Sequence, residues 1–157
     1  MTDARTAARP TVVVTTMASD SHTWNLVFLQ LLLEELGYEV VNLGPCVPDD
    51  LLVNRCAALR PAFVVVSSVN GHGHQDGLRV IGKLRSHPDL TSTPVVIGGK
   101  LGVDGKSSAR ARELRAAGFD EVFEEEQDPA TALAIFAASL HQTVAPGRLP
   151  VPLHTAR

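Results

Sequence analysis

The stretch TVVVTTM (residues 11–17), followed at once by ASDSH (residues 18–22), decides how this chain folds. A run of β-branched and apolar residues predicts a buried strand. The polar residues that come directly after the run then lie at the carboxyl end of that strand. In a parallel α/β sheet, this edge is where ligands bind, so the stretch predicts both a core strand and a binding edge.

Four further apolar runs follow, and segments of helical character separate them. We predict strands over residues 39–43, 62–68, 94–97 and 121–123, and helices over residues 23–36, 48–60, 75–86, 107–117 and 128–140. The central runs are apolar throughout, which is typical of parallel strands covered on both faces. The sequence therefore predicts one α/β domain, flavodoxin-like (Rossmann-like) and doubly wound. It has five parallel strands in the order 2-1-3-4-5 and helices on both faces.

The chain of 157 residues is long enough for one domain with a full core and too short for two ordinary ones. Residues 1–10 are polar and mixed in charge, and we predict a flexible lead there. The folded domain is expected over residues 11–142. Residues 143–157 contain several prolines, so we predict a mobile tail for them.

The amino-acid composition argues against some classes of binding partner and indicates the cellular compartment. Hydrophobic residues make up 45% of the chain and aromatic residues 4%, which indicates an aliphatic core. The net charge of -3 argues against nucleic-acid binding. No apolar run approaches the roughly 20 residues of a membrane span. The spacing of Cys46 and Cys56 fits no common zinc pattern, so we expect reduced thiols and a cytoplasmic protein.

Three short motifs converge in the predicted topology. Asp20 and His22 leave the end of the first strand, Ser67 ends the third, and Gly98-Gly99 follows the fourth. All of them border the crevice between strands 1 and 3, where the strand order reverses. A carboxylate that holds one imidazole nitrogen leaves the other free to bind a metal. The pattern predicts that His22 is a metal ligand and that Asp20 orients it.

Each residue also has a simpler interpretation. Asp20 could cap a helix, and His22 could be a surface residue. Ser67 could bond the neighbouring backbone, and the glycines could provide a positive φ for a turn. It is the combination of the three motifs that favours a binding site.

Other motifs are weaker. His72 and His74 could both reach one ion, but no carboxylate or Cys partner is close in sequence. Gly105-Lys106-Ser107 resembles the end of a phosphate-binding loop whose first glycine is missing. The acidic run Glu124-Glu125-Glu126 is interpreted as a solvated turn.

The three motifs match the order Asp-x-His-x-x-Gly, Ser-x-Leu, Gly-Gly. This chain reads Asp20-Ser21-His22-Thr23-Trp24-Asn25, then Ser67-Ser68-Val69, then Gly98-Gly99. From about Val12 to Leu140, it resembles the cobalamin-binding small subunits of glutamate mutases, within the B12-binding-domain superfamily. Two positions depart from the pattern, because Asn25 replaces a glycine and Val69 replaces a leucine.

The resemblance implies that residues 11–142 form a cobalamin-binding domain for adenosylcobalamin. His22 would ligate the cobalt, with the cofactor's own benzimidazole displaced, and Asp20 would hydrogen-bond the other ring nitrogen. Ser67 would bond the buried benzimidazole, and Gly98-Gly99 would make room for the nucleotide tail. Further implied cofactor contacts are Ser21, Thr23, Asn25, Val69 and Gly71.

The resemblance also implies that the cofactor and the substrate bind to two different subunits. The chain would be the cofactor subunit of a carbon-skeleton mutase (an isomerase) that converts L-glutamate to 3-methylaspartate, and it would be inactive alone. A larger barrel subunit would bind the substrate, and the two would form a heterotetramer. Two other functions remain open: a corrinoid carrier for methyl transfer, and a B12-domain relative with a non-catalytic binding role.

Overall fold

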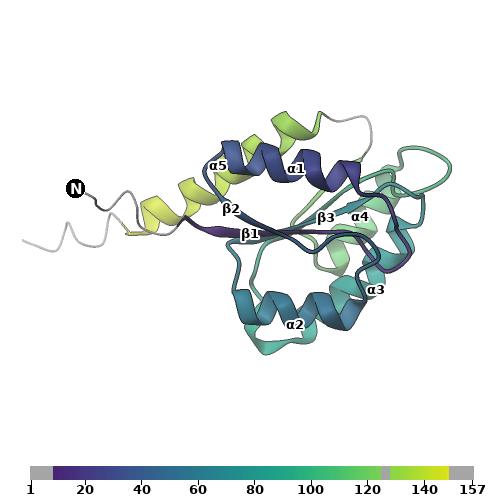
Figure 1. Cartoon of the computed structure of the whole chain (residues 1–157), viewed down its shortest axis with the longest axis horizontal. Helices are drawn as coiled ribbons and strands as arrows, with labels where there is room; N and C mark the ends of the chain where they lie inside the picture. Colours follow the sequence, from purple (N-terminus) through teal and green to yellow (C-terminus); the bar gives the residue numbers. More distant parts are fainter. Residues whose placement is uncertain (1–8, 125–127, 149–157) are drawn as a thin grey trace, which may run out of the picture. The chain divides into compact units, whose positions relative to one another are not determined.

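Strands and helices alternate along the whole chain in the computed structural model, which describes residues 9–124 and 128–148 (Figure 1). The first compact unit, up to residue 126, holds the five strands, and the last helix lies in a second unit from residue 127. The elements are β1 (Thr11–Thr15), α1 (Trp24–Glu35), β2 (Glu39–Asn42), α2 (Asp49–Leu59), β3 (Phe63–Ser68), α3 (Gly73–Ser86), the short 3-10 helix η2 (Pro88–Leu90), β4 (Val95–Gly99), α4 (Ser108–Ala117), β5 (Glu121–Glu124) and α5 (Pro129–Arg148).

The five strands form one parallel sheet in the order β2-β1-β3-β4-β5, which confirms the predicted topology. Figure 1 shows α1 on one face of this sheet, with α2 and α3 on the other. Helices cover both faces of the central strands, and all six residues of β3 are buried. The unbroken apolar runs in the sequence follow from this burial.

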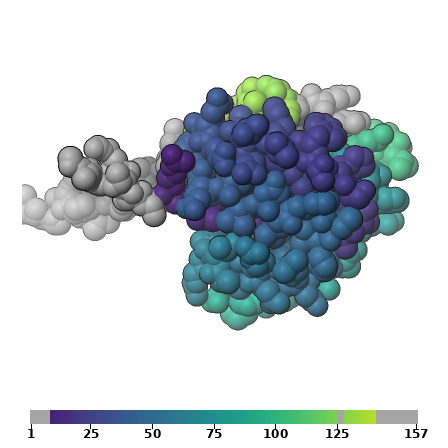
Figure 2. All heavy atoms as spheres, in the orientation of Figure 1, coloured from purple at the N-terminus to yellow at the C-terminus, as the bar shows by residue number. Residues whose placement is uncertain are grey.

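Helix α1 packs on the sheet through one stripe of leucines. Leu26, Leu29 and Leu33 are buried, as their helical spacing predicts. Leu36 has the same spacing but is 41% exposed, because the helix ends at Glu35 and Leu36 follows its last turn. The outer face of α1 lies on the molecular surface (Figure 2) and carries exposed apolar side chains, Trp24, Val27, Phe28 and Leu31.

Three predicted boundaries are wrong. Strand β4 includes Gly98 and Gly99, because these residues stay in register with β3 and β5 instead of opening a loop. Helix α3 begins at Gly73, so His74 is helical. Helix α5 continues to Arg148, where we had expected it to end near Leu140, since neither proline nor glycine interrupts it before Pro146. The rest of the expected tail, 149–157, lies outside the described residues, as do residues 1–8.

None of the helices in the described part of the chain combines the length and apolar character that crossing a membrane requires.

The two cysteines should differ sharply in reactivity. Cys46 is exposed, whereas Cys56 is fully buried in the core, and burial raises the pKa of its thiol to about 12. At pH 8 the Cys56 thiol therefore stays protonated and shielded, and thiolate is the reactive form. We expect a disulfide reagent to modify Cys46 rapidly and Cys56 only after unfolding. The substitution Cys46→Ser should abolish the fast phase, and a fast phase that persists would contradict this burial.

Candidate functional site

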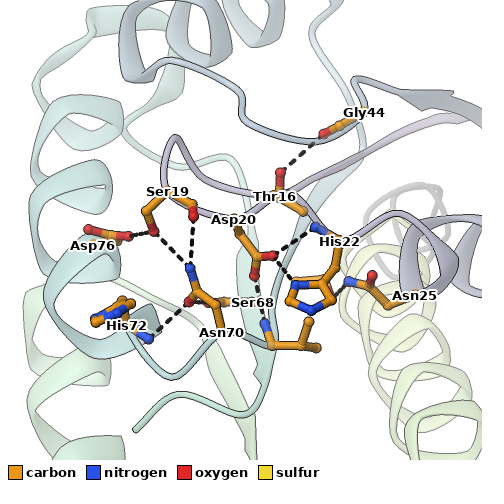
Figure 3. A network of polar contacts seen from close by, with 12 residues as sticks. Thr16, Ser19, Asp20, His22, Asn25, Gly44, Ser68, Asn70, His72 and Asp76 are labelled. Atoms are coloured by element: carbon orange, nitrogen blue, oxygen red, sulfur yellow. Dashed lines mark hydrogen bonds and ion pairs between the residues drawn. The ribbon is translucent and has the colours of Figure 1, made fainter. Parts of the chain in front are cut away.

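The candidate site lies at the carboxyl edge of the sheet, where the loop after β1 meets the loop after β3 (Figure 3). Asp20 is at its centre and is fully buried. Its Oδ1 accepts a hydrogen bond from the backbone N–H of His22 (3.0 Å) and lies 2.7 Å from His22 Nδ1. Its Oδ2 accepts from the backbone N–H of Val69 at 2.7 Å. One carboxylate thus orients the imidazole and ties the loops together.

The carboxylate also sets the chemical state of the pair. Burial alone would raise the pKa of Asp20, but the hydrogen bonds from Val69 and His22 outweigh it, so this pKa lies below its ordinary value. A charged Asp20 next to Nδ1 assigns the ring proton to that nitrogen. The other nitrogen, Nε2, keeps its lone pair for an acceptor role. The His22 side chain is 46% exposed, so a ligand can reach the ring.

Three polar residues brace this loop, and the sequence analysis did not assign them to the site. Ser19 Oγ donates to Asp76 Oδ2 on α3 at 2.6 Å. Asn70 Nδ2 donates to the backbone oxygen of Ser19 at 2.9 Å, and Asn70 Oδ1 accepts from the N–H of His72 at 2.9 Å (Figure 3). The signal that could have found Ser19 and Asn70 is their position directly after two central strands.

A second polar pair is buried near the same edge of the sheet. Asn25, in the first turn of α1, is 5% exposed, and Ser67 at the end of β3 is 6% exposed. Asn25 Nδ2 donates to Ser67 Oγ at 2.6 Å. The sequence analysis named both residues as cofactor contacts, and the structure brings them together. It also shows that the Ser67 oxygen already accepts one hydrogen bond from within the protein.

The glycine pair of β4 is required by the sheet itself. Gly99 has a φ of +114°, and a Cβ there would collide with the backbone oxygen of Ser68. A Cβ on Gly98 would lie 2.9 Å from the backbone oxygen of Phe123. We had interpreted the pair as making room for a ligand. Contacts within the protein account for both glycines, so they are not independent evidence of a ligand.

The remaining expected contacts lie around the rim of the crevice. Ser21 and Thr23 are exposed on either side of His22, and Val69 is half-buried beside Asp20. Gly71 has a φ of +88° and donates its N–H to the backbone oxygen of Lys100 at 3.2 Å. The structure therefore places all the predicted residues at one edge of the sheet.

The weaker motifs have structural roles. Ser107 caps α4 by accepting from the N–H of Arg110, and its own N–H donates to Glu124 at 2.7 Å. Glu124 was expected in a solvated turn, but it ends β5, is 5% exposed and pairs with Arg110 at 3.2 Å. His74 Nε2 lies 2.7 Å from Glu113. In the described part of the chain, no group of three His, Cys, Asp or Glu residues could hold a metal ion.

This arrangement defines the class of ligand that the site suits. It offers one oriented imidazole nitrogen, and a metal bound by protein alone needs three or four ligands. A metal bound here must therefore bring most of its ligands with it, as the cobalt of a corrinoid does. The imidazole lies at the edge where β1 and β3 end, which is the switch point of the sheet.

Comparison with known protein families agrees with this class of ligand. The family described as "B12 binding domain" matches residues 10–134. The match spans most of the chain, and the chain belongs to this family.

Several curated proteins are similar over most of their length. Glutamate mutase sigma subunit 1 of Haloarcula marismortui is 32% identical over 141 residues, which cover 85% of this chain and 87% of that protein. The glutamate mutase sigma subunit of Treponema denticola is 27% identical over 133 residues, covering 83% and 91% of the two chains.

Solved structures share the fold. A cobalamin-binding protein from Desulfitobacterium hafniense superposes with a TM-score of 0.66 at 23% identity, over 83% of this chain and 58% of that one. The chemotaxis protein CheY4 of Vibrio cholerae superposes with a TM-score of 0.64 at 14% identity, over 85% and 99%. At these identities the likeness shows the flavodoxin-like fold alone.

The Asp20 carboxylate should stabilise the protein even without a ligand. Replacing Asp20 with Ala leaves the N–H groups of Val69 and His22 without their acceptor. We expect the free energy of unfolding to fall by about 2–4 kcal/mol, measured by urea denaturation. Asp50→Ala is the control, because the Asp50 side chain is 89% exposed and should change stability by less than about 0.5 kcal/mol. Equal effects of the two substitutions would contradict the central role of Asp20.

Proposed function

We propose that this chain is the cofactor subunit of an adenosylcobalamin-dependent carbon-skeleton mutase of the glutamate mutase type. The observation that carries the proposal is the Asp20–His22 pair, whose exposed imidazole lies at the switch point of a B12-binding domain. Both curated relatives described above are glutamate mutase subunits, which favours a mutase over a methyl carrier.

The residues present fit a corrinoid with its own lower base displaced. His22 Nε2 would bind the cobalt from below, and Asp20 would hold the ring in the required tautomer. The nucleotide tail would lie at the edge where Asn25 and Ser67 are found, and the buried polar groups there suit a polar ligand better than an apolar one. When bound, the cofactor supplies the radical chemistry, while the protein supplies ligation and orientation.

The charged Asp20 has a further role in this chemistry. Its two backbone hydrogen bonds, from Val69 and His22, would hold the carboxylate in place, so that the imidazole keeps one orientation toward the metal. Because Val69 follows β3 and His22 follows β1, these contacts would fix the ligand relative to both strands.

We place the substrate site on a larger barrel subunit, which would cover the upper face of the corrin in a heterotetramer. The naming of the relatives as sigma subunits supports a second kind of subunit. The cytoplasm is the compartment that we propose, because Cys46 and Cys56 are both free thiols.

Ligation by His22 can be measured directly by EPR. Protein labelled with 15N-histidine and mixed with cob(II)alamin should show a doublet superhyperfine splitting from the 15N ligand, instead of the triplet that 14N benzimidazole produces. His22→Ala should lose the doublet and bind at least about tenfold more weakly. His87→Ala, at the far end of α3, should keep it. A triplet in the labelled wild-type protein would show that the cofactor keeps its own base and would refute the proposal.

The chain alone should bind the cofactor without turning over substrate. We expect no conversion of glutamate by the purified protein with adenosylcobalamin, and conversion once a compatible large subunit is added. Formation of 3-methylaspartate can be followed by NMR in both mixtures. Turnover by the isolated chain would show that the substrate site lies on this subunit.

A further inference from the structure

Asn25 contains a buried polar atom without a partner. Its Nδ2 donates to Ser67 Oγ at 2.6 Å, but its Oδ1 is buried and accepts nothing. Among the described residues, no other buried side-chain nitrogen or oxygen lacks a partner. Folded proteins seldom leave such an atom unpaired, so its environment needs an explanation.

The position of Asn25 in the fold offers an explanation for its unpaired oxygen. Its partner Ser67 is the penultimate residue of β3 and is in register with Gly98 of β4, near the carboxyl edge of the sheet. His22 precedes Asn25 by three residues, in the loop after β1, and its side chain is 46% exposed. The unpaired oxygen therefore lies near the edge of the sheet where our proposed function places the nucleotide tail, at a position where the family pattern has a glycine.

The Asn25–Ser67 pair offers two complementary groups. The Ser67 oxygen accepts from Asn25, so its hydroxyl hydrogen is available for an acceptor such as a ring nitrogen of a base. Asn25 Oδ1 needs an O–H or N–H donor. A ligand that satisfies both groups carries an acceptor and a donor close together.

We propose that Asn25 is a specificity-determining residue for the corrinoid tail, accepting a hydrogen bond from an O–H or N–H donor of that tail. This inference rests on the proposed function. The donor has two possible sources: a ribose hydroxyl, present in every complete corrinoid, or an amino group on the lower base, absent from dimethylbenzimidazole. Through Asn25, the protein prefers complete corrinoids to cobinamide, which lacks the tail.

The test compares dissociation constants of three corrinoids for the wild-type protein, Asn25→Ala and Asn25→Gly. The ligands are cobalamin, a cobamide with an adenine base, and cobinamide. Binding can be followed by quenching of Trp24, the single tryptophan of the chain, which is 67% exposed and adjacent to Asn25. Thermal unfolding of the free variants checks that they fold.

We expect both substitutions to weaken binding of a complete corrinoid by about tenfold, the effect of one buried hydrogen bond, and to leave cobinamide binding unchanged. A loss for both complete corrinoids identifies the ribose as the donor, and a loss for the adenine form alone identifies the base. Tighter cobalamin binding by Asn25→Gly would show that Asn25 only obstructs the crevice and would overturn the inference. Equal losses for cobinamide, or no loss, would overturn it as well.

Failure of the inference is distinguishable from failure of the proposed function. If His22 does not ligate cobalt, the 15N doublet is absent from the wild-type protein and from both Asn25 variants. If His22 does ligate cobalt and only the inference is wrong, the doublet is present and the substitutions at Asn25 do not discriminate between corrinoids with and without the tail.

Discussion

The hydrogen bonds to the Asp20 carboxylate are the interaction on which the candidate site depends. Three N–H groups from two loops converge on one buried side chain, and they keep it charged although no lysine or arginine among the described residues pairs with it. Because the carboxylate is fully buried, its hydrogen bonds are less screened by water than those of a surface group. The same contacts that stabilise the junction of β1 and β3 therefore orient the imidazole.

The parallel sheet explains why so short a segment can build a site. Each strand ends at the same edge, so loops far apart in the sequence meet there. Ser19, Asn70 and Asp76 then lock the loops to α3 through side-chain hydrogen bonds (Figure 3). A ligand that brings its own equatorial donors needs little more from the protein than one oriented nitrogen and a polar crevice.

Glu124 and Asn25 are both buried polar residues, but their hydrogen bonding differs. Glu124 is buried but fully engaged by Arg110 and the N–H of Ser107, so it stabilises the start of α4. Asn25 is equally buried, but only its Nδ2 has a hydrogen-bond partner and its Oδ1 has none. The two residues therefore differ in their hydrogen bonding and not in their burial, and this difference is the basis of our proposal for Asn25.

The strand order and the convergence of Asp20, His22 and Ser67 could be predicted from the sequence alone, because apolar runs and parallel topology are local patterns with few solutions. The contact between Asp20 and His22 was predicted as well, whereas only the tertiary structure decided the contacts between more distant segments. The pairing of Asn25 with Ser67, the collision that requires glycine at Gly99 and the burial of Glu124 all depend on distances of a few ångströms between segments remote in sequence. Such distances result from packing of the whole domain, and no local pattern of residue types encodes them.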